Sequence, residues 1–341
     1  MFKLLIGRFS QSDLYAIKKI NFWLPPVIFD SHFHCWSVNN CHSLINEQAR
    51  VPALTFNSFP WEEHEPILSL LFPKIRVKLA TIGFPYTVGD CDNQYNAGLS
   101  QDKRSWPVVP ILTLSGKVNK VKAQQNLKKD FFGLKMYPTL EQKAKQTTKI
   151  IEVFPKNILA VVNQLALPII LHLPKDIFTN LDELLALARE YERINFIVAH
   201  MGNVYCQYQD YKLALKAIAR QPNILLDTAM VADSNIIAQA LIVLGDKRIL
   251  FGSDAPFAYI RGQHIDIGNH ETRLVCNLPV LWAKEGKQYR ANLDTKAFKL
   301  MYIKIILSIK DGIKLANLST KEIEIKENIF FCNSESIFTR R

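Results

Sequence analysis

The sequence has few cysteines, and their arrangement excludes a small disulfide-bonded domain. Six cysteines are spread over 341 residues, and no two of them form a C-x-x-C pair. Such sparse thiols are typical of proteins in a reducing compartment. We therefore expect free cysteines and a cytoplasmic location.

Long hydrophobic runs and tracts of one charge are also missing. No apolar run reaches the length of a transmembrane helix, and the first residues lack the apolar core and cleavage site of a signal peptide. The net charge is +11, but it comes mostly from scattered lysines, without zinc-finger or RNA-binding motifs. We expect no membrane and no nucleic-acid partner. The charge favours a small anionic substrate as the partner, and a homodimer is left open.

The sequence does contain a regular alternation of apolar strands and amphipathic helices. Continuously apolar strands are buried on both faces, which predicts parallel pairing with helical crossovers. The predicted strands are 27–33, 77–84, 108–115, 131–137, 168–173, 194–200, 223–229 and 248–254. Helical spacing of apolar residues is found in 181–191, 213–219 and 235–244.

Eight strand and helix units predict an α/β fold, a (β/α)8 TIM barrel, over residues 27–335. Residues 1–26, which end in two prolines, are interpreted as an N-terminal extension. Two segments fit the pattern less well. The segment 35–76 has several prolines and no clear helix, and 255–300 is long enough to carry an insertion.

Polar residues stand at the ends of five predicted strands. They are His32 and His34 on the first strand, Lys135 on the fourth, His172 on the fifth, His200 on the sixth and Asp254 on the eighth. All strands of a barrel end at one rim, where barrel enzymes have their active sites. Burying these groups without a shared partner would be costly. Their coincidence favours a metal site over a set of unrelated core and loop residues.

The pair His32 and His34 suits metal binding. Residues two apart point to the same side of a strand, and Asp30 shares that side one layer deeper. Neutral imidazoles bind Zn²⁺ and similar ions, and a catalytic site leaves one position open for water. Asp254 is placed to act as general base on such a water. An H-x-H motif alone is weak evidence, so the interpretation depends on the other strand ends.

The remaining histidines lie outside the predicted strands. His42 and His64 belong to the proline-containing segment, and His264 and His270 follow the eighth strand. A lone histidine in such a position is more often hydrogen-bonded in a loop than bound to a metal. We therefore interpret all four as loop or surface residues.

The strand ends and their neighbours resemble the amidohydrolase superfamily. The matching stretches are FDSHFHCW, FFGLKMYP, PIILHLP, FIVAHMGN, NILLDTA and ILFGSDAPF, and the tail ENIFFCNSESIF resembles a closing helix. The sequence is most similar to the amidohydrolase-related branch, which includes decarboxylases of the aminocarboxymuconate-semialdehyde type. The resemblance covers most of the chain and implies a metal-dependent TIM-barrel enzyme. It does not extend to residues 1–26, 35–76 and 261–300.

The resemblance implies roles for the matched residues. His32, His34, His172 and Asp254 would hold a divalent metal, most simply one Zn²⁺, with Mn²⁺ or Fe²⁺ as alternatives. Asp254 would also take the proton from water. His200 would be catalytic by polarising the substrate's carbonyl, or would bind a second metal. Asp30 would hold a ligand histidine in its orientation.

Lys135 has two alternative roles. If its amine is carboxylated, it would bridge two metals; with a single metal it would contact the substrate. We favour the single metal. Lys135, Tyr137 and Arg261 are hypotheses for substrate binding, based on their rim positions and on the charge of the two cations.

The expected activity is metal-dependent hydrolysis of an amide, lactone or ester in a small anionic substrate. The first alternative is a decarboxylase, a C–C lyase on the same barrel, because the ligand set does not separate the two reactions. The second is a barrel that binds a metal or ligand without catalysis. A two-histidine iron oxygenase is disfavoured, since those sites occur on antiparallel sheet folds.

Overall fold

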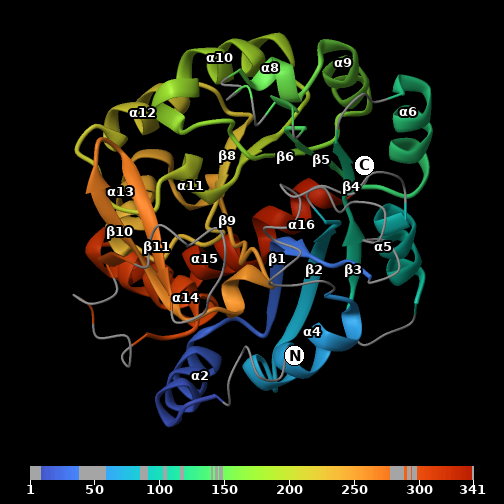
Figure 1. Cartoon of the computed structure of the whole chain (residues 1–341). Coiled ribbons are helices and arrows are strands. Elements are labelled where there is room, and N and C mark those ends of the chain that lie inside the picture. The colour runs from blue at the N-terminus through green and yellow to red at the C-terminus, as the bar shows by residue number, and fades with distance from the viewer. Residues whose placement is uncertain are drawn as a thin grey trace.

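A ring of parallel strands forms the centre of the computed structural model (Figure 1). The structure describes residues 9–37, 59–84, 91–102, 106–115, 119–139, 141–142, 145, 149–276, 288–289, 293 and 298–339. The strands are β1 (Val27–His34), β2 (Arg76–Ile82), β3 (Val108–Pro110), β4 (Leu112–Ser115), β5 (Leu134–Tyr137), β6 (Ile169–Leu171), β7 (Phe196–Val198), β8 (Ile224–Asp227) and β9 (Ile249–Leu250). Each lies within or overlaps one of the eight predicted segments.

Two connections close the ring into an eight-stranded barrel. The predicted strand 108–115 is interrupted at Ile111, where β3 pairs with β2 and β4 pairs with β5. Ile111 still bonds to the neighbouring strand through its amide and the Thr81 carbonyl, at 2.9 Å, so β3 and β4 act as one barrel strand. At the other end, the chain after β9 runs beside β1, with a parallel bridge between Phe33 and Ala255. The TIM barrel expected from the sequence is confirmed.

Helices surround the ring (Figure 1). They are α4 (Trp61–Leu71), α5 (Cys91–Gln101), α6 (Lys120–Lys129), α8 (Ile150–Val153), α9 (Lys156–Leu165), α10 (Ile177–Glu190), α11 (His200–Asn203), α12 (Tyr211–Ile218), α13 (Ser234–Leu244) and α14 (Met301–Leu315). The three predicted helices correspond to α10, α12 and α13. In α10, for example, the Asp176 side chain caps the first turn by accepting from the Thr179 amide at 2.8 Å.

The inside of the barrel holds a separate apolar cluster. Its members are Phe29, Ala80, Ile82, Val109, Ile111, Ile170, Ile197, Ala199, Leu225, Leu250 and Phe338. Phe338 ends α16 (Asn333–Phe338), which follows α15 (Glu322–Glu327) and the π-turn Asn328–Cys332. The tail of the chain thus contributes to the same interior cluster as the strands. With this layer filled, polar side chains remain for the rim at the carboxyl ends of the strands.

Three segments that the sequence prediction left unassigned contain helices or strands. The segment read as lacking a clear helix forms α4, which contains Pro66 and is held by a buried apolar face. The long segment after β9 forms an antiparallel hairpin of β10 (Gly262–Gly268) and β11 (Glu271–Cys276). The N-terminal extension forms α2 (Gln11–Trp23), which packs against α14. Among the described residues, no helix is long and apolar enough to cross a membrane.

Candidate metal centre

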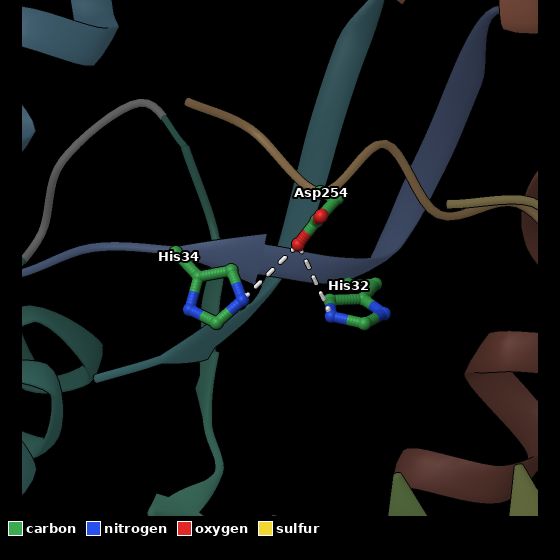
Figure 2. Close-up of side chains that lie close together, drawn as sticks. All are labelled: His32, His34 and Asp254. Atoms are coloured by element: carbon green, nitrogen blue, oxygen red, sulfur yellow. Dashed lines mark ion pairs between the residues drawn. The ribbon is translucent and has the colours of Figure 1, made fainter. Parts of the chain in front are cut away.

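His32, His34 and Asp254 bring three ligand atoms together at the rim of the barrel (Figure 2). Their ligand atoms lie within 4.8 Å of one another. Asp254 Oδ1 is 3.4 Å from His32 Nε2 and 3.2 Å from His34 Nε2. A register shift between Asp30 and Phe33 marks a bulge in β1 at this point, and bulges redirect side chains beside active sites.

The outer nitrogen of each ligand imidazole already has a partner. Nδ1 of His32 is 2.8 Å from Asp227 Oδ2, and Nδ1 of His34 is 3.1 Å from the Gly83 carbonyl. An Nδ1–H that donates to oxygen leaves Nε2 with its lone pair directed at the centre. Burial, together with the charge of Lys135, holds the pKa of His32 well below its ordinary value, so the ring is neutral as a ligand must be. The donor set therefore fits a divalent metal such as zinc.

The turn after β9 places Asp254 beside His32 and His34. A Cβ on Gly252 would lie 2.8 Å from the Cβ of His32, so only glycine lets the chain pass this close to β1. The Asp254 amide donates to the His32 carbonyl at 2.8 Å, with Asp254 in the left-handed region at φ 66°. Burial alone would raise the pKa of Asp254, but the hydrogen bond with His34 and the nearby His32 and His200 hold it below its ordinary range.

Asp227, at the end of β8, is a site residue that the sequence prediction missed. One oxygen of its buried carboxylate accepts from the His32 ring, and the other accepts from the amides of His200 and Ala229, at 2.8 and 3.1 Å. Asp227 therefore orients His32 and also fixes the turn that carries His200. The stretch NILLDTA was part of the resemblance, and its aspartate stands at a strand end like the other polar residues. This strand-end position was the feature of the sequence that could have identified Asp227 as a site residue.

His200 and His172 extend the site along the rim. The His200 ring lies 5.1 Å from that of His32 and 5.0 Å from that of His172, between ring centroids. Its Nδ1 is 2.9 Å from the Ala229 carbonyl, which leaves Nε2 for another partner. His172 directly follows β6, and its ring is 6.4 Å from that of Tyr137. His172 thus borders the centre, while the ligand atoms that converge within the described residues are those of His32, His34 and Asp254.

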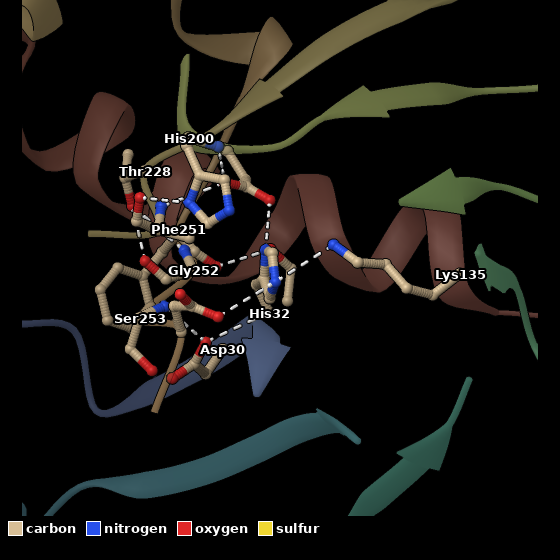
Figure 3. Close-up of polar contacts among 12 residues, drawn as sticks. Asp30, His32, Lys135, His200, Thr228, Phe251, Gly252 and Ser253 are labelled. Atoms are coloured by element: carbon tan, nitrogen blue, oxygen red, sulfur yellow. Dashed lines mark hydrogen bonds and ion pairs between the residues drawn. The ribbon is translucent and has the colours of Figure 1, made fainter. Parts of the chain in front are cut away.

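Lys135 is fully buried and points into the barrel (Figure 3). Its strand register pairs it with Ile170 of the interior cluster, and its Nζ lies 3.3 Å from His32 Nε2. Burial lowers the pKa of Lys135 to about 8, against the attraction of Asp227 and Asp254. A larger neutral fraction suits carboxylation, and a charged fraction suits an anionic substrate, so both roles stay open. Beside it, the hydroxyl of Tyr137 is 3.3 Å from His34 Nε2.

The structure changes the interpretation of Asp30. Its carboxylate does not touch a ligand imidazole; it accepts from the backbone amides of His32 and Ser253, at 3.2 and 2.9 Å, and from the Tyr302 hydroxyl at 2.8 Å. Asp30 therefore joins the backbone of β1 to that of the Asp254 turn. Burial raises the pKa of Asp30 to about 7, although each of these donors opposes the rise.

Arg261 also has a different position from the expected one. Its guanidinium bonds to the carboxylate of Asp13 in α2 and to the carbonyl of Phe298, at 3.3 Å. This pairing occupies the group that was expected to anchor substrate. Arg261 therefore connects the Asp254 turn to the N-terminal helix.

Two of the histidines interpreted as loop or surface residues belong to regular elements and pack against aromatic side chains. His64 is fully buried in α4, where its Nδ1 is 2.9 Å from the Tyr259 hydroxyl. His264 lies on β10, and its ring stacks on Tyr205 at 4.4 Å. Tyr205 is in turn 5.8 Å from His200, so the hairpin reaches the edge of the site. His42 lies outside the described residues.

The second half of the barrel carries a known family pattern. Residues 129–262 match the sequence model of the amidohydrolase family. The matched segment includes Lys135, His172, His200, Asp227 and Asp254, and it ends where the hairpin begins. No match is found among curated protein sequences.

Solved structures with this fold include a zinc-bound amidohydrolase and a manganese-bound decarboxylase. A zinc-bound amidohydrolase from Burkholderia multivorans shares 12% identity, with a TM-score of 0.58 over 92% of this chain and 100% of that chain. A Pseudomonas putida protein, whose name proposes a 2-pyrone-4,6-dicarboxylic acid hydrolase, shares 12%, with a TM-score of 0.55 over 92% and 98%. The manganese complex of 5-carboxyvanillate decarboxylase from Novosphingobium aromaticivorans shares 13%, with a TM-score of 0.51 over 93% and 96%.

At these identities the solved structures establish a shared fold and leave the reaction open. The sequence match adds the family pattern around the strand ends from β5 to the Asp254 turn. The converging ligand atoms of His32, His34 and Asp254 add a place for a metal. On these grounds residues 129–262 match the amidohydrolase family pattern, and the whole chain shares its barrel fold with a solved amidohydrolase.

Proposed function

We propose that this protein is a metal-dependent hydrolase that cleaves an amide, lactone or ester bond of a small anionic substrate. The observation that carries the proposal is the convergence of two imidazole nitrogens and one carboxylate oxygen at the carboxyl ends of β1 and β9. Three protein ligands at one position are typical of catalytic zinc sites, whereas structural zinc sites are closed by four.

His32, His34 and Asp254 would hold the metal, and His172 borders the same space. A divalent ion there supplies Lewis-acid chemistry, which makes water acidic enough to react near neutral pH and polarises a carbonyl. A single zinc ion is the simplest occupant; manganese or iron would suit the same donors, and a second ion would need a carboxylated Lys135.

Asp254 is the proposed general base. Its pKa lies below the ordinary range, so the carboxylate is ionised at neutral pH and can accept a proton. Oδ1 faces the two histidines, which leaves Oδ2 to take the proton from water and to return it to the leaving group. The Asp254 side chain is only 14% exposed, which limits competition from bulk water.

His200 and Lys135 are the proposed contacts for the substrate. Nδ1 of His200 is bound to a carbonyl, so Nε2 is the nitrogen that can stabilise negative charge developing on the substrate. The Lys135 amine is buried next to His32, with Nζ 3.3 Å from His32 Nε2. When charged, it would attract a carboxylate of the substrate. Tyr137 adds a hydroxyl beside His34.

Decarboxylation is the second candidate. It is favoured by the shared fold with a manganese-bound decarboxylase, and the same ligands and the same lysine would serve it. The two reactions differ in their products. Only the lyase releases CO₂ from an aromatic or muconate-like acid, whereas only the hydrolase consumes lactones, esters or amides.

Metal content and turnover test the proposal together. Protein purified without chelators is expected to contain about one zinc, manganese or iron per chain, and to hydrolyse at least one member of a lactone, ester and amide panel. Asp254→Asn is expected to abolish turnover and to remain folded. The matched control is Asp130→Asn at the exposed end of α6, which should retain full activity.

Each alternative has its own outcome in this experiment. CO₂ release without hydrolysis would assign the decarboxylase. Bound metal with no reaction on either panel would favour the non-catalytic barrel, and full activity in Asp254→Asn would disprove the role of Asp254. Two metals per chain would make carboxylated Lys135 the bridging ligand.

A further inference from the structure

The N-terminal helix α2 carries a buried acid on the face that meets the barrel. Asp13 has no exposed side-chain area. It also closes the capping box at the start of the helix, where its Oδ2 accepts from the amide and the hydroxyl of Ser10, both at 2.7 Å. The start of α2 is therefore fixed in the same contacts that hold Asp13.

Arg261 is the partner of this acid. Its Nη1 donates to Asp13 Oδ1 at 3.0 Å, and its Nη2 donates to Asp13 Oδ2. The arginine side chain is only 14% exposed, so the pair is shielded from water. A paired, two-point contact of this kind fixes orientation as well as distance. Although burial opposes it, the pair with Arg261 and the bonds from Ser10 keep the pKa of Asp13 below its ordinary value.

A short and continuous turn connects Arg261 to Asp254. The Phe257 amide donates to the Asp254 carbonyl at 2.9 Å, and the Ile260 amide donates to the Phe257 carbonyl at 3.3 Å. The far end of the turn is tied to α14, because the Met301 amide donates to the Ile260 carbonyl at 2.9 Å. The side chain of Arg261 then ties the same end to α2.

We propose that α2 positions the metal loop, with Asp13 and Arg261 acting as positioning residues for the Asp254 carboxylate. The inference rests on the proposed metal site. The N-terminal helix lies outside the matched segment 129–262 and outside the resemblance seen in the sequence, whereas Arg261 lies at the end of the matched segment. Loss of the pair releases one of the anchors at the far end of the turn, and Asp254 Oδ1 then meets the histidines less accurately.

The other end of the same helix provides a matched control. Trp23 donates its indole N–H to Glu322 of α15, and Lys326 donates to the Trp23 carbonyl at 2.8 Å. These contacts hold α2 on the barrel without involving the Asp254 turn. If α2 were only a stabilising element, loss of either anchor would have the same consequence. If α2 positions Asp254, only the Asp13–Arg261 anchor affects the metal.

The experiment compares full-length wild type, Asp13→Asn, Arg261→Gln and Glu322→Ala after removal and return of metal. Zinc affinity is measured by competition with a chromophoric chelator, and the visible absorption of the cobalt-substituted protein reports the ligand geometry. We expect Asp13→Asn and Arg261→Gln each to weaken zinc binding by about tenfold and to change the cobalt spectrum. Glu322→Ala should match wild type in both measurements, and the Asp13→Asn, Arg261→Gln double variant should be no weaker than either single variant.

The outcomes separate this inference from the proposed function. Wild type that binds no zinc or cobalt would overturn the metal site itself. Wild type that binds zinc, with unchanged affinity and spectrum in both Asp13→Asn and Arg261→Gln, would overturn the positioning role alone. Equal weakening in Glu322→Ala would also overturn it, since α2 would then act only by general stabilisation. If Asp13→Asn does not fold because its helix cap is weakened, Arg261→Gln still decides the question.

Discussion

A single carboxylate, that of Asp227, controls two parts of the site that come from different strands. One of its oxygens accepts a hydrogen bond from the ring of His32. The other accepts from the backbone amides of His200 and Ala229. Both oxygens are needed as acceptors, because each of the three partners donates a hydrogen. The residue can therefore be tested by removing one acceptor without changing its size.

Asp227→Asn is expected to weaken zinc binding by roughly 10- to 100-fold, because an asparagine has one acceptor oxygen and leaves either His32 or the amide pair without a partner. The buried donor left over should also lower the free energy of unfolding by about 1–3 kcal/mol. Chelator competition and urea unfolding measure the two effects. Asp233→Asn, which changes the exposed cap of α13 in the same way, should leave zinc affinity unchanged. Equal zinc affinity in Asp227→Asn would show that His32 is oriented by something else.

Gly252 gives a second prediction for a single residue. An alanine Cβ there would lie 2.8 Å from the Cβ of His32, so strands β1 and β9 would have to separate. We expect Gly252→Ala to lower the free energy of unfolding by about 1–3 kcal/mol and to weaken zinc binding. Gly98→Ala is the control, because that glycine is in α5 with nothing within 4 Å and should stabilise by about 0.5–1 kcal/mol. Equal stability of the two variants would contradict the close approach.

Among the secondary structure elements, the barrel strands were the most predictable. Their continuous apolar runs and the polar residues at their ends placed the rim, and hence the residues that surround the centre. The elements that the sequence did not predict depend on tertiary contacts. Helix α4 contains Pro66, which opposes a helix, and forms because its apolar face is buried. The hairpin turns at Asn269 and His270, both in the left-handed region at φ 54° and 58°, and histidine there gives no turn signal.

The pairwise contacts inside the site could not be predicted from the sequence either. Strand alternation placed Asp30 and His32 on one side, but it could not show that Asp30 binds backbone amides. Arg261 stands seven residues after Asp254, so its position at the rim was a reasonable expectation. Its partner Asp13 is distant in the sequence, and no local pattern links the two.

The hairpin contributes a pH dependence through His264. Burial and, to a smaller extent, Lys304 and His200 lower the pKa of His264 to about 3. In the unfolded chain the same ring titrates near its ordinary value of about 6.5. Between these two values the unfolded state binds a proton that the folded state does not, so stability falls as the pH falls through this window.

His264→Phe keeps a ring to stack on Tyr205 and removes this titration. At pH 7.5 the His264 ring is neutral in both the folded and the unfolded wild type, so the difference in free energy of unfolding between variant and wild type contains no contribution from its titration. At pH 5 the variant should have gained about 1–2 kcal/mol relative to wild type. Urea unfolding of metal-free protein at the two pH values measures the difference. A constant difference at both values would show that His264 titrates normally in the folded hairpin.

At the scale of the whole molecule, the candidate metal centre lies where the barrel closes. His32 and His34 belong to β1, the first strand, and Asp254 follows β9, the last one. The family pattern covers residues 129–262 and so includes β9 and Asp254. The two histidines come from β1, which lies outside the matched segment. A metal at this position connects the two ends of the strand sequence, in addition to the backbone bonds between Ser31 and Phe251 and between His34 and Ala255.

Metal binding is therefore expected to stabilise the entire barrel and not only the rim. Zinc at 100 times its dissociation constant should add about 2.7 kcal/mol to the free energy of unfolding, provided that it binds the folded state alone. Thermal unfolding of stripped protein, with and without zinc, measures this gain, and His34→Asn should remove most of it. Hydrogen exchange locates the effect: β1 and the turn after β9 should gain protection, because the ion joins them, whereas α9 on the outside should gain only what global stability provides. Protection confined to the rim loops, with no change in the unfolding temperature, would mean that the ion does not link the two strands that close the barrel.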